Sequence, residues 1–238
     1  MSMGIFITGT DTGVGKTVVA AVLARLLHMR GLSVGVMKPV TSGCRAEDGR
    51  LVSDDARLLC QAAWVDCSDD VAPYLLREPV APAEAAKLDG VVIDFGRIRA
   101  SFDRLAAAHD FVIVEGAGGL MVPLAGGLLV ADLARQLGLS LLVVARPGLG
   151  TINHTVLTCF AAQQMGLKVA GVVINNYPDA AGLAERSAPH HIGSLCGAAV
   201  LGIWPHRDDL DELELVEGLA DWLDGQAETD IVLRELGL

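Results

Sequence analysis

Six short runs of mostly β-branched or aliphatic residues recur along the chain, and longer stretches suited to helices separate them. These runs are predicted strands, at residues 5–8, 34–38, 111–115, 141–145, 169–174 and 199–203. Several are apolar throughout rather than alternating, which is typical of strands covered on both faces. The pattern therefore predicts an α/β fold of the P-loop NTPase type, with a doubly wound, mostly parallel sheet and helices on both faces.

No repeat of fixed period or low-complexity linker interrupts this pattern, so we expect residues 1–238 to form a single domain. The stretch 73–82, which begins and ends with proline, is expected to be an irregular connection. Charge sets the carboxyl end apart, because residues 208–238 hold eleven acidic side chains and only Arg234 as a base. We expect this tail to be a solvated acidic helix. The rest of the chain is nearly neutral and lacks the basic footprint of a nucleic-acid-binding protein.

Apolar residues make up 52% of the chain, yet no run reaches the roughly 18 residues that a membrane helix needs. No basic leader precedes the first apolar run, so we expect a cytoplasmic protein without a membrane partner. The five cysteines are odd in number and widely spaced, which fits neither a disulfide framework nor a paired zinc motif. We expect them to be buried or idle thiols.

A glycine-rich segment follows the first predicted strand. Residues 8–17 read TGTDTGVGKT and precede a predicted apolar helix over 16–29. This context is typical of a P-loop: the glycines let backbone N–H groups face phosphate oxygens, Lys16 reaches the outer phosphates, and Thr17 offers a hydroxyl to magnesium. The generic pattern has glycine where Thr10 stands, so this loop is one residue longer. An ordinary glycine-rich turn that caps a helix is the alternative.

A second lysine follows the next predicted strand, in the segment KPVTSG at residues 38–43. We expect Lys38 at the carboxyl edge of a strand that neighbours the P-loop strand, where ligands of such sheets collect. A fixed cation there could hold an anionic reactant against the γ-phosphate. A surface lysine before a turn that starts at Pro39 is the alternative.

Carboxylates suited to a hard cation occur twice. The third predicted strand ends in VEGAGG, residues 114–119, where Glu115 could coordinate magnesium. Asp54 and Asp55 precede a predicted helix, and one of them could supply a second carboxylate. The Asp pair could instead cap that helix.

A fourth segment, PGLGTINHT at residues 147–155, follows another predicted strand and opens a helix with small and polar residues. Backbone N–H groups at such a helix start could receive an anion.

The four segments TGTDTGVGKT, KPVTSG, VEGAGG and GTINHT resemble, in order and approximate spacing, those of the dethiobiotin synthetases, and the resemblance covers roughly residues 3–205. It implies an ATP- and Mg²⁺-dependent cyclo-ligase of biotin biosynthesis. Such an enzyme joins CO2 to an amine of 7,8-diaminononanoate, phosphorylates the carbamate with a nucleoside triphosphate, and closes a ureido ring. The resemblance also implies a homodimer with active sites shared at the interface.

The resemblance assigns a role to each matching position. It implies nucleotide contacts from Asp11, Thr12, Gly13, Val14, Gly15, Lys16, Thr17, Asn175 and Pro205, and magnesium ligands Thr17, Asp55 and Glu115. Catalytic roles fall on Thr12, Lys16 and Lys38, and substrate contacts on Lys38, Ser42, Gly150, Thr151, Ile152 and Asn153. Asn175 lies in INNYP where many relatives have Asn-Asp, and Gly13 stands where some carry an acid near the sugar. The preferred base therefore stays open.

Two other classes of protein fit parts of the pattern. A cobyrinate-type amidotransferase would need a further glutaminase domain with a cysteine nucleophile. A non-catalytic P-loop switch of the partitioning-ATPase type would place its signature lysine where Asp11 stands. Such a switch would also want a basic rather than an acidic carboxyl-terminal helix to associate with membranes. The ligase is the interpretation that accounts for all four segments.

Overall fold

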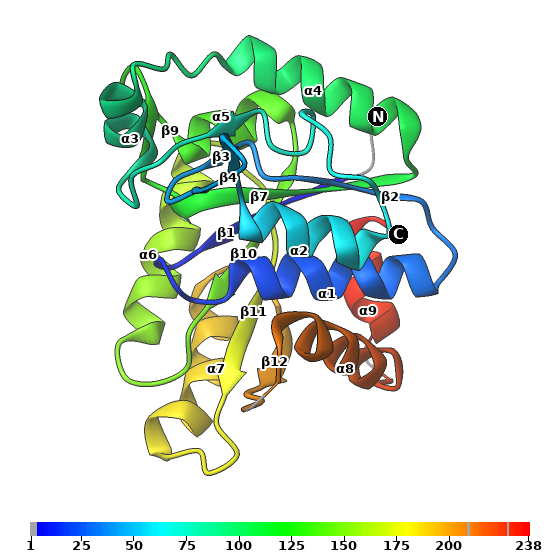
Figure 1. Ribbon diagram of the computed structural model, residues 1–238. Helices are drawn as coiled ribbons and strands as arrows, with labels where there is room; N and C mark the ends of the chain where they lie inside the picture. Colours follow the sequence, from blue (N-terminus) through cyan, green and yellow to red (C-terminus); the bar gives the residue numbers. More distant parts are fainter. Residues whose placement is uncertain (1–3, 209, 228) are drawn as a thin grey trace.

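A six-stranded, fully parallel sheet forms the centre of the molecule, in the computed structural model that describes residues 4–208, 210–227 and 229–238. Its strand order is β12-β11-β10-β1-β7-β2 (Figure 1). The strands are β1 (Gly4–Gly9), β2 (Val34–Met37), β7 (Phe111–Gly119), β10 (Ser140–Ala145), β11 (Val169–Tyr177) and β12 (Val200–Pro205). All six predicted strands are confirmed, as is the doubly wound α/β class.

One predicted neighbour relation is wrong. β2 pairs with β7, in the register Val36 to Ile113, and β7 lies between β2 and the P-loop strand β1. Strand order depends on where each crossover returns to the sheet, and a strand formed later in the chain can fill the place beside β1. Lys38 therefore follows an edge strand.

Helices cover both faces of the sheet, as predicted. They are α1 (Lys16–Met29), α2 (Asp54–Ala63), α3 (Pro82–Asp89), α4 (Phe95–Ala108), α5 (Val130–Leu137), α6 (Thr151–Gln164), α7 (Leu183–Leu195), α8 (Glu212–Asp224) and α9 (Thr229–Leu236). Successive residues of β1 face opposite ways: Ile5 and Ile7 pack with α1, α2 and α8, whereas Phe6 packs with α4 and α5. Burial on both faces is the reason the strands are apolar throughout.

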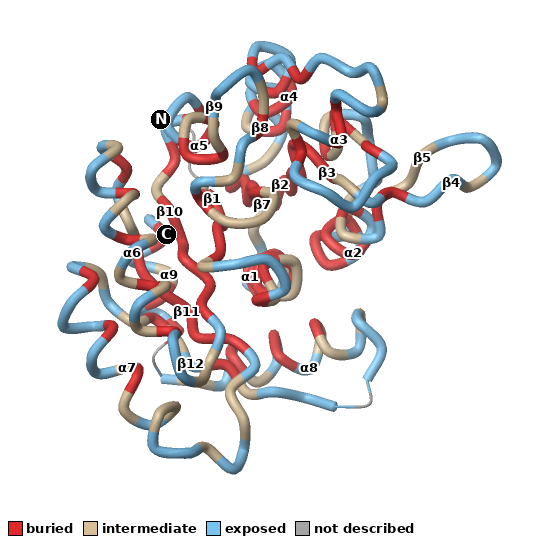
Figure 2. Tube along the Cα trace, turned by 90° about the vertical axis from the view of Figure 1, so that its left-hand side faces the viewer, coloured by how far each residue is buried: buried red, intermediate tan, exposed pale blue. Residues whose placement is uncertain are grey.

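Three small two-stranded sheets lie outside the main one. They pair β3 (Val40–Thr41) with β6 (Tyr74–Leu75), β4 (Arg45–Glu47) with β5 (Arg50–Val52), and β8 (Pro123–Ala125) with β9 (Leu128–Leu129). The β4–β5 hairpin projects from the body and is largely exposed (Figure 2). Apart from the two residues of β6, the stretch 73–81 is irregular, as predicted. None of the described helices has the length and apolarity needed to cross a membrane.

The acidic tail differs from its prediction. It contains α8 and α9 rather than one solvated helix, and Val216, Leu219 and Leu223 of α8 are buried in the core that includes α1. Acidic side chains occupy the outer positions, where Glu217 pairs with Arg25 at 3.3 Å. The high charge concealed an amphipathic pattern, in which one apolar face packs and the other is solvated.

The prediction for the cysteines is wrong for one pair. Cys60 and Cys67 form a disulfide, whereas Cys44, Cys159 and Cys196 are free and buried as expected. The chain turns sharply after α2, so that residues 7 positions apart meet with their Cα atoms 5.7 Å apart. Spacing alone did not reveal this turn, because it uses a tryptophan rather than a glycine in the left-handed region.

Candidate active site

The predicted P-loop lies between β1 and α1, at the carboxyl edge of the sheet. Gly15 caps α1 with φ 86° and ψ 34°, a left-handed conformation that glycine adopts readily. A Cβ at Gly15 would also lie only 2.1 Å from Nδ2 of Asn175. That amide donates to the carbonyl of Val14 at 3.2 Å, so Asn175 braces the loop from β11. The glycine is therefore required both by its conformation and by this close approach.

Lys16, the first residue of α1, folds back over the loop, and its Nζ donates to the carbonyl of Asp11 at 3.1 Å. Only 6% of the residue is exposed. Burial lowers the pKa of Lys16, although the charge of Glu115 counteracts part of this effect. A buried ammonium held by a backbone carbonyl is suited to exchange that contact for a phosphate oxygen.

Lys38 lies between two carboxylates. Its Nζ is 2.6 Å from Oδ2 of Asp55 and 2.6 Å from Oε1 of Glu115, and the same Glu115 oxygen accepts a hydrogen bond of 2.9 Å from Thr17 Oγ1. Side chains from four elements thus meet here: Lys38 follows β2, and the others belong to α2, β7 and α1. Burial alone would lower the pKa of Lys38, but the charges of Glu115 and Asp55 raise it, so the ammonium form is maintained.

Glu115 is the most buried carboxylate of this group, with 1% of the residue exposed. Burial raises the pKa of Glu115, and the positive charge of Lys38 acts against this rise. Its second oxygen, Oε2, is buried without a hydrogen-bond partner among the described residues. A buried carboxylate oxygen without a partner is energetically costly, which indicates that a further positive group belongs at this position.

The Asp pair has divided roles. Asp55 faces Lys38, whereas Asp54 accepts a hydrogen bond of 2.9 Å from Arg45 Nε of the projecting hairpin. Neither residue caps α2, because Ser53 is the N-cap and its Oγ accepts from the backbone N–H of Ala56 at 3.1 Å. The alternative of a capping Asp pair is therefore wrong.

A cavity of about 370 Å³ opens beside these groups. Most of the predicted loop, metal and reacting-end residues line it: Thr12, Gly13, Gly15, Lys16, Thr17, Lys38, Ser42, Asp55 and Glu115. Sequence reasoning missed seven further residues of its wall: Val18, Val40, Thr41, Leu58, Ala117, Gly118 and Glu212. Glu212 begins α8, and no motif in the acidic tail indicated that it reaches the P-loop.

Other predicted residues lie outside this wall. Asp11 is exposed at the tip of the loop, and its carboxylate accepts from the backbone N–H of Thr12 at 2.7 Å. Pro205 ends β12 at the same edge of the sheet as the loop. Val14 packs into the core, with 3% of the residue exposed.

The start of α6 does not border the cavity within one chain. Gly150 is its N-cap, with φ 94°, and Thr151 is buried with Oγ1 donating to the carbonyl of Arg146 at 2.5 Å. Ile152 is half-buried and Asn153 is exposed. The helix therefore begins where it was predicted to begin, but its first residues do not line the cavity that contains Lys38.

Comparison with known proteins decides between the classes considered above. Residues 3–214 match the family model described as an AAA domain. The ATP-dependent dethiobiotin synthetase of Bacillus licheniformis is 42% identical over 221 residues, which are 93% of each chain. The enzyme of that name from Thermodesulfovibrio yellowstonii is 38% identical over 91% of this chain and 94% of its own. This chain belongs to the dethiobiotin synthetase family. The protein is accordingly an ATP-dependent ligase of the kind that makes dethiobiotin.

Solved structures with other names share the fold. A ParA-family ATPase of Chlorobium tepidum aligns over all of both chains with a TM-score of 0.57 and 15% identity. The septum site-determining protein MinD of Pyrococcus horikoshii aligns over 99% of this chain and 94% of its own, with a TM-score of 0.58 and 18% identity. Identities this low show a shared P-loop fold alone.

Proposed function

We propose that this ligase closes the ureido ring of dethiobiotin from 7,8-diaminononanoate, CO2 and ATP, as one domain that acts in the cytoplasm. An amine nitrogen adds to CO2 and loses a proton, giving a carbamate. A carbamate oxygen attacks the γ-phosphorus of ATP, and ADP leaves. The second amine then attacks the carbonyl carbon of the mixed anhydride and loses a proton, phosphate leaves, and the ring is closed. The phosphoryl transfer brings two anions together and the ring closure releases another, so positive groups at fixed positions are the main requirement.

The observation that carries this proposal is the pair of buried lysines on the wall of one cavity. Lys16 belongs to the P-loop, whereas Lys38 comes from the end of β2 and is fixed by Asp55 and Glu115. Two cations from different elements support a reaction in which two anions, a carbamate and a triphosphate, must approach each other. Hydrolysis of the nucleotide by water brings no second anion to the triphosphate, so it does not require a cation at the position of Lys38.

The oxygen ligands around Lys38 fit a magnesium ion. Thr17 Oγ1, Asp55 and Glu115 converge there, and the buried Glu115 Oε2 without a partner is suited to a hard cation. Among the described residues, no group of three or more His, Cys, Asp or Glu side chains is placed to hold a metal ion by itself. Magnesium commonly uses one or two protein carboxylates and completes its shell with phosphates and waters. When bound, it would neutralise charge on the triphosphate.

Nucleotide recognition is supported at the same edge of the sheet. A Cβ at Gly13 would meet no atom within 4 Å, so space for a sugar adjoins the loop. Glu212, at the start of α8, lines the P-loop cavity together with Gly13. It offers a carboxylate there, which Gly13 lacks. We therefore extend the proposed nucleotide contacts, Asp11 to Thr17, Asn175 and Pro205, with Glu212 on the side of the sugar.

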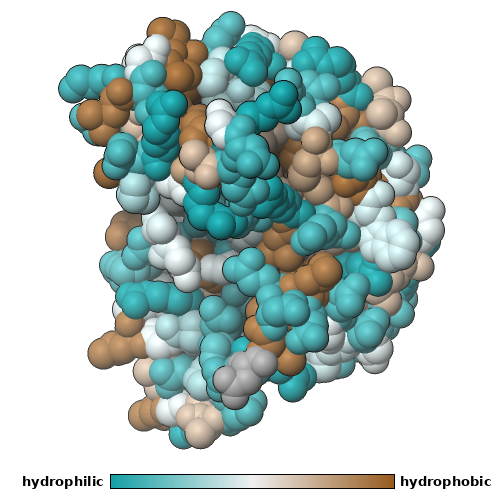
Figure 3. Space-filling view, viewed as in Figure 1, coloured by the Kyte–Doolittle hydropathy of each residue, from teal (hydrophilic) through white to brown (hydrophobic). Residues whose placement is uncertain are grey.

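The remaining requirement is a site for the substrate carboxylate, several bonds away from the amines. We place it at the start of α6 in the partner subunit of a homodimer, where Gly150, Thr151, Ile152 and Asn153 present a helix amino terminus. Exposed apolar residues on this side of the protomer support a dimer. Leu149, Leu157 and Phe160 are 89%, 56% and 57% exposed. Hydrophobic surface gathers along the edge where α3 and α6 lie (left in Figure 3).

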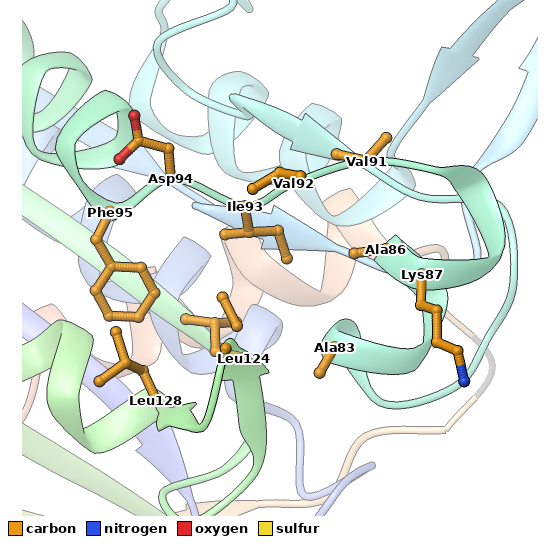
Figure 4. Close-up of a pocket in the computed structure, with 12 residues that line it drawn as sticks. Ala83, Ala86, Lys87, Val91, Val92, Ile93, Asp94, Phe95, Leu124 and Leu128 are labelled. Carbon is orange, nitrogen blue, oxygen red and sulfur yellow. The ribbon is translucent and has the colours of Figure 1, made fainter.

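A hollow on the same side could receive side chains of the partner. It measures about 590 Å³ and lies between α3, the segment 91–95 and the β8–β9 hairpin. Figure 4 shows Val92, Ile93, Phe95, Leu124 and Leu128 around it, with Lys87 at the rim. Val92 is 85% exposed, an unusual fraction for a valine beside other apolar groups. Apolar surface of this extent supports burial against a second copy of the chain.

One assay tests the proposed reaction. Nucleotide hydrolysis should require 7,8-diaminononanoate and bicarbonate together, and should yield one dethiobiotin for each phosphate released. A P-loop switch would hydrolyse nucleotide without either compound. A cobyrinate-type enzyme would respond to an acidic macrocycle and an amide donor instead. Phosphate release that is indifferent to diaminononanoate would therefore refute the proposal.

A further inference from the structure

A disulfide-bonded turn follows α2, and its two cysteines do not line the cavity of the groups assigned to catalysis. The bond joins Cys60, in the last turn of the helix, to Cys67. Between them, Trp64 adopts the left-handed conformation with φ 58° and ψ 43° and closes the helix end. Its backbone N–H donates to Gln61, and that of Val65 donates to Cys60. A tryptophan in this conformation is unfavourable, because its Cβ lies too close to the following carbonyl oxygen, so neighbouring contacts must stabilise the turn.

Contacts with α1 supply part of that stabilisation. The ring of Trp64 stacks on His28 with centroids 5.5 Å apart, and the guanidinium of Arg25 lies 5.2 Å from its centroid. Trp64 itself is 67% exposed. The disulfide supplies a covalent restraint on the same turn.

The two cysteines differ sharply in accessibility. Cys60 is 3% exposed, whereas Cys67 is an exposed residue. A surface hollow of about 640 Å³ adjoins both, and Arg57, Asp66 and Glu217 are the charged residues that line it. A hollow of this size admits a small molecule. Thiol–disulfide exchange needs one accessible sulfur and a second within bonding reach, and this turn provides both.

We propose that Cys60 and Cys67 form a site of reversible thiol–disulfide exchange with a low-molecular-weight disulfide. In the reduced protein, the Cys67 thiolate attacks one sulfur of the small disulfide, which forms a mixed disulfide and releases one small thiolate. Cys60 then loses its proton and attacks Cys67 Sγ, which forms the protein disulfide and releases the second small thiol. The two cysteines are oxidised by two electrons, and the small disulfide is reduced to two thiols.

Reversible thiol–disulfide exchange, rather than a permanent disulfide, suits the cytoplasm, which is the compartment expected from the sequence. Reducing thiol pools keep most protein cysteines reduced in the cytoplasm, so a pair in bonding contact there is oxidised only when the pool becomes oxidising.

The pair also adjoins elements of the active site. Cys67 Sγ lies 3.4 Å from the carbonyl oxygen of Ala56, the residue after Asp55. Leu213, which follows Glu212 on α8, lines the hollow.

The experiment uses the full-length, reduced protein treated with oxidised glutathione at pH 8 and analysed by peptide mass spectrometry. We expect the wild type to lose two hydrogen atoms across Cys60 and Cys67, and a small thiol to restore them. In Cys60→Ser, Cys67 should retain one glutathione, because no second sulfur resolves the adduct. In Cys67→Ser, Cys60 should stay unmodified, because it is buried.

The three buried cysteines are internal controls. Burial, the main cause, and the neighbouring Cys196, the second, raise the pKa of Cys159 to about 12. Its reactive thiolate is therefore scarce at pH 8. We expect Cys67 to react at least about tenfold faster than Cys44, Cys159 or Cys196. Absence of a bond between Cys60 and Cys67, or absence of the adduct on Cys67 in Cys60→Ser, would overturn the proposal. Circular dichroism of each variant distinguishes a folded protein that does not react from an unfolded one.

Discussion

Lys38 and Lys16 are both buried lysines of one cavity, yet their surroundings differ. Lys38 is fixed by two carboxylates, and Lys16 rests on a backbone carbonyl of the P-loop. We therefore predict that Lys38→Met lowers turnover on the order of 10²-fold or more while nucleotide affinity changes less than about threefold. Lys16→Met should weaken both. Titration calorimetry with a non-hydrolysable ATP analogue gives the affinities, and phosphate release gives the turnover. Equal losses of affinity in the two variants would contradict this division of roles.

The carboxylates around Lys38 allow a matched comparison that includes two adjacent residues of one helix. Asp55→Asn and Glu115→Gln each replace a charged oxygen ligand by a neutral amide. Either change should raise the magnesium concentration for half-maximal rate by at least about tenfold. Asp54→Asn is the control, because Asp54 is exposed and faces Arg45, and it should shift this concentration less than about twofold. A larger shift for Asp54→Asn than for Asp55→Asn would mean that the assignment within the pair is reversed.

At the scale of elements, the tail of the chain offers a test of what its helices do. Leu219 of α8 is 2% exposed and belongs to the core that includes α1. Leu219→Ala should destabilise the protein by about 2–5 kcal/mol, because it leaves a cavity under the helix. Urea unfolding followed by circular dichroism measures this loss. Glu235→Ala, at an exposed position of α9, is the control and should stay within about 0.5 kcal/mol. Equal stabilities of the two variants would show that the tail is dispensable to the core.

Much of this architecture could be predicted from local patterns. The apolar run at residues 34–38 gave β2, and the GKT sequence gave the first residue of α1, because strand burial and the P-loop are both local signals. The position of β2 beyond β7 could not be predicted, since it depends on contacts between distant segments. For the same reason the sequence did not predict that Glu212 reaches the P-loop cavity. Candidate site residues that follow the end of a strand were predictable, whereas a residue that packing brings to the cavity from a distant segment was not.

At the scale of the whole molecule, the start of α6 does not border the cavity that holds Lys38 within one protomer. A substrate with amines at one end and a carboxylate at the other would need both regions at once. A two-fold dimer can bring the α6 start of one chain to the cavity of the other, and every site is then composite. The exposed Leu149, Leu157 and Phe160 lie on or directly beside the helix that would make this contact.

Mixing two damaged chains tests this arrangement. Lys38→Ala removes the cation at the reacting end, and Asn153→Asp places a negative charge at the proposed carboxylate site. Each homodimer should be inactive, whereas a heterodimer should contain one site with both defects and one intact site. After complete exchange of subunits, about a quarter of wild-type activity should return. Native mass spectrometry verifies that heterodimers form, and circular dichroism verifies that both variants fold. If heterodimers form and no activity returns, the proposal is wrong. Lys38 and Asn153 would then belong to the site of one chain, because each site in the mixture would contain one of the two defects.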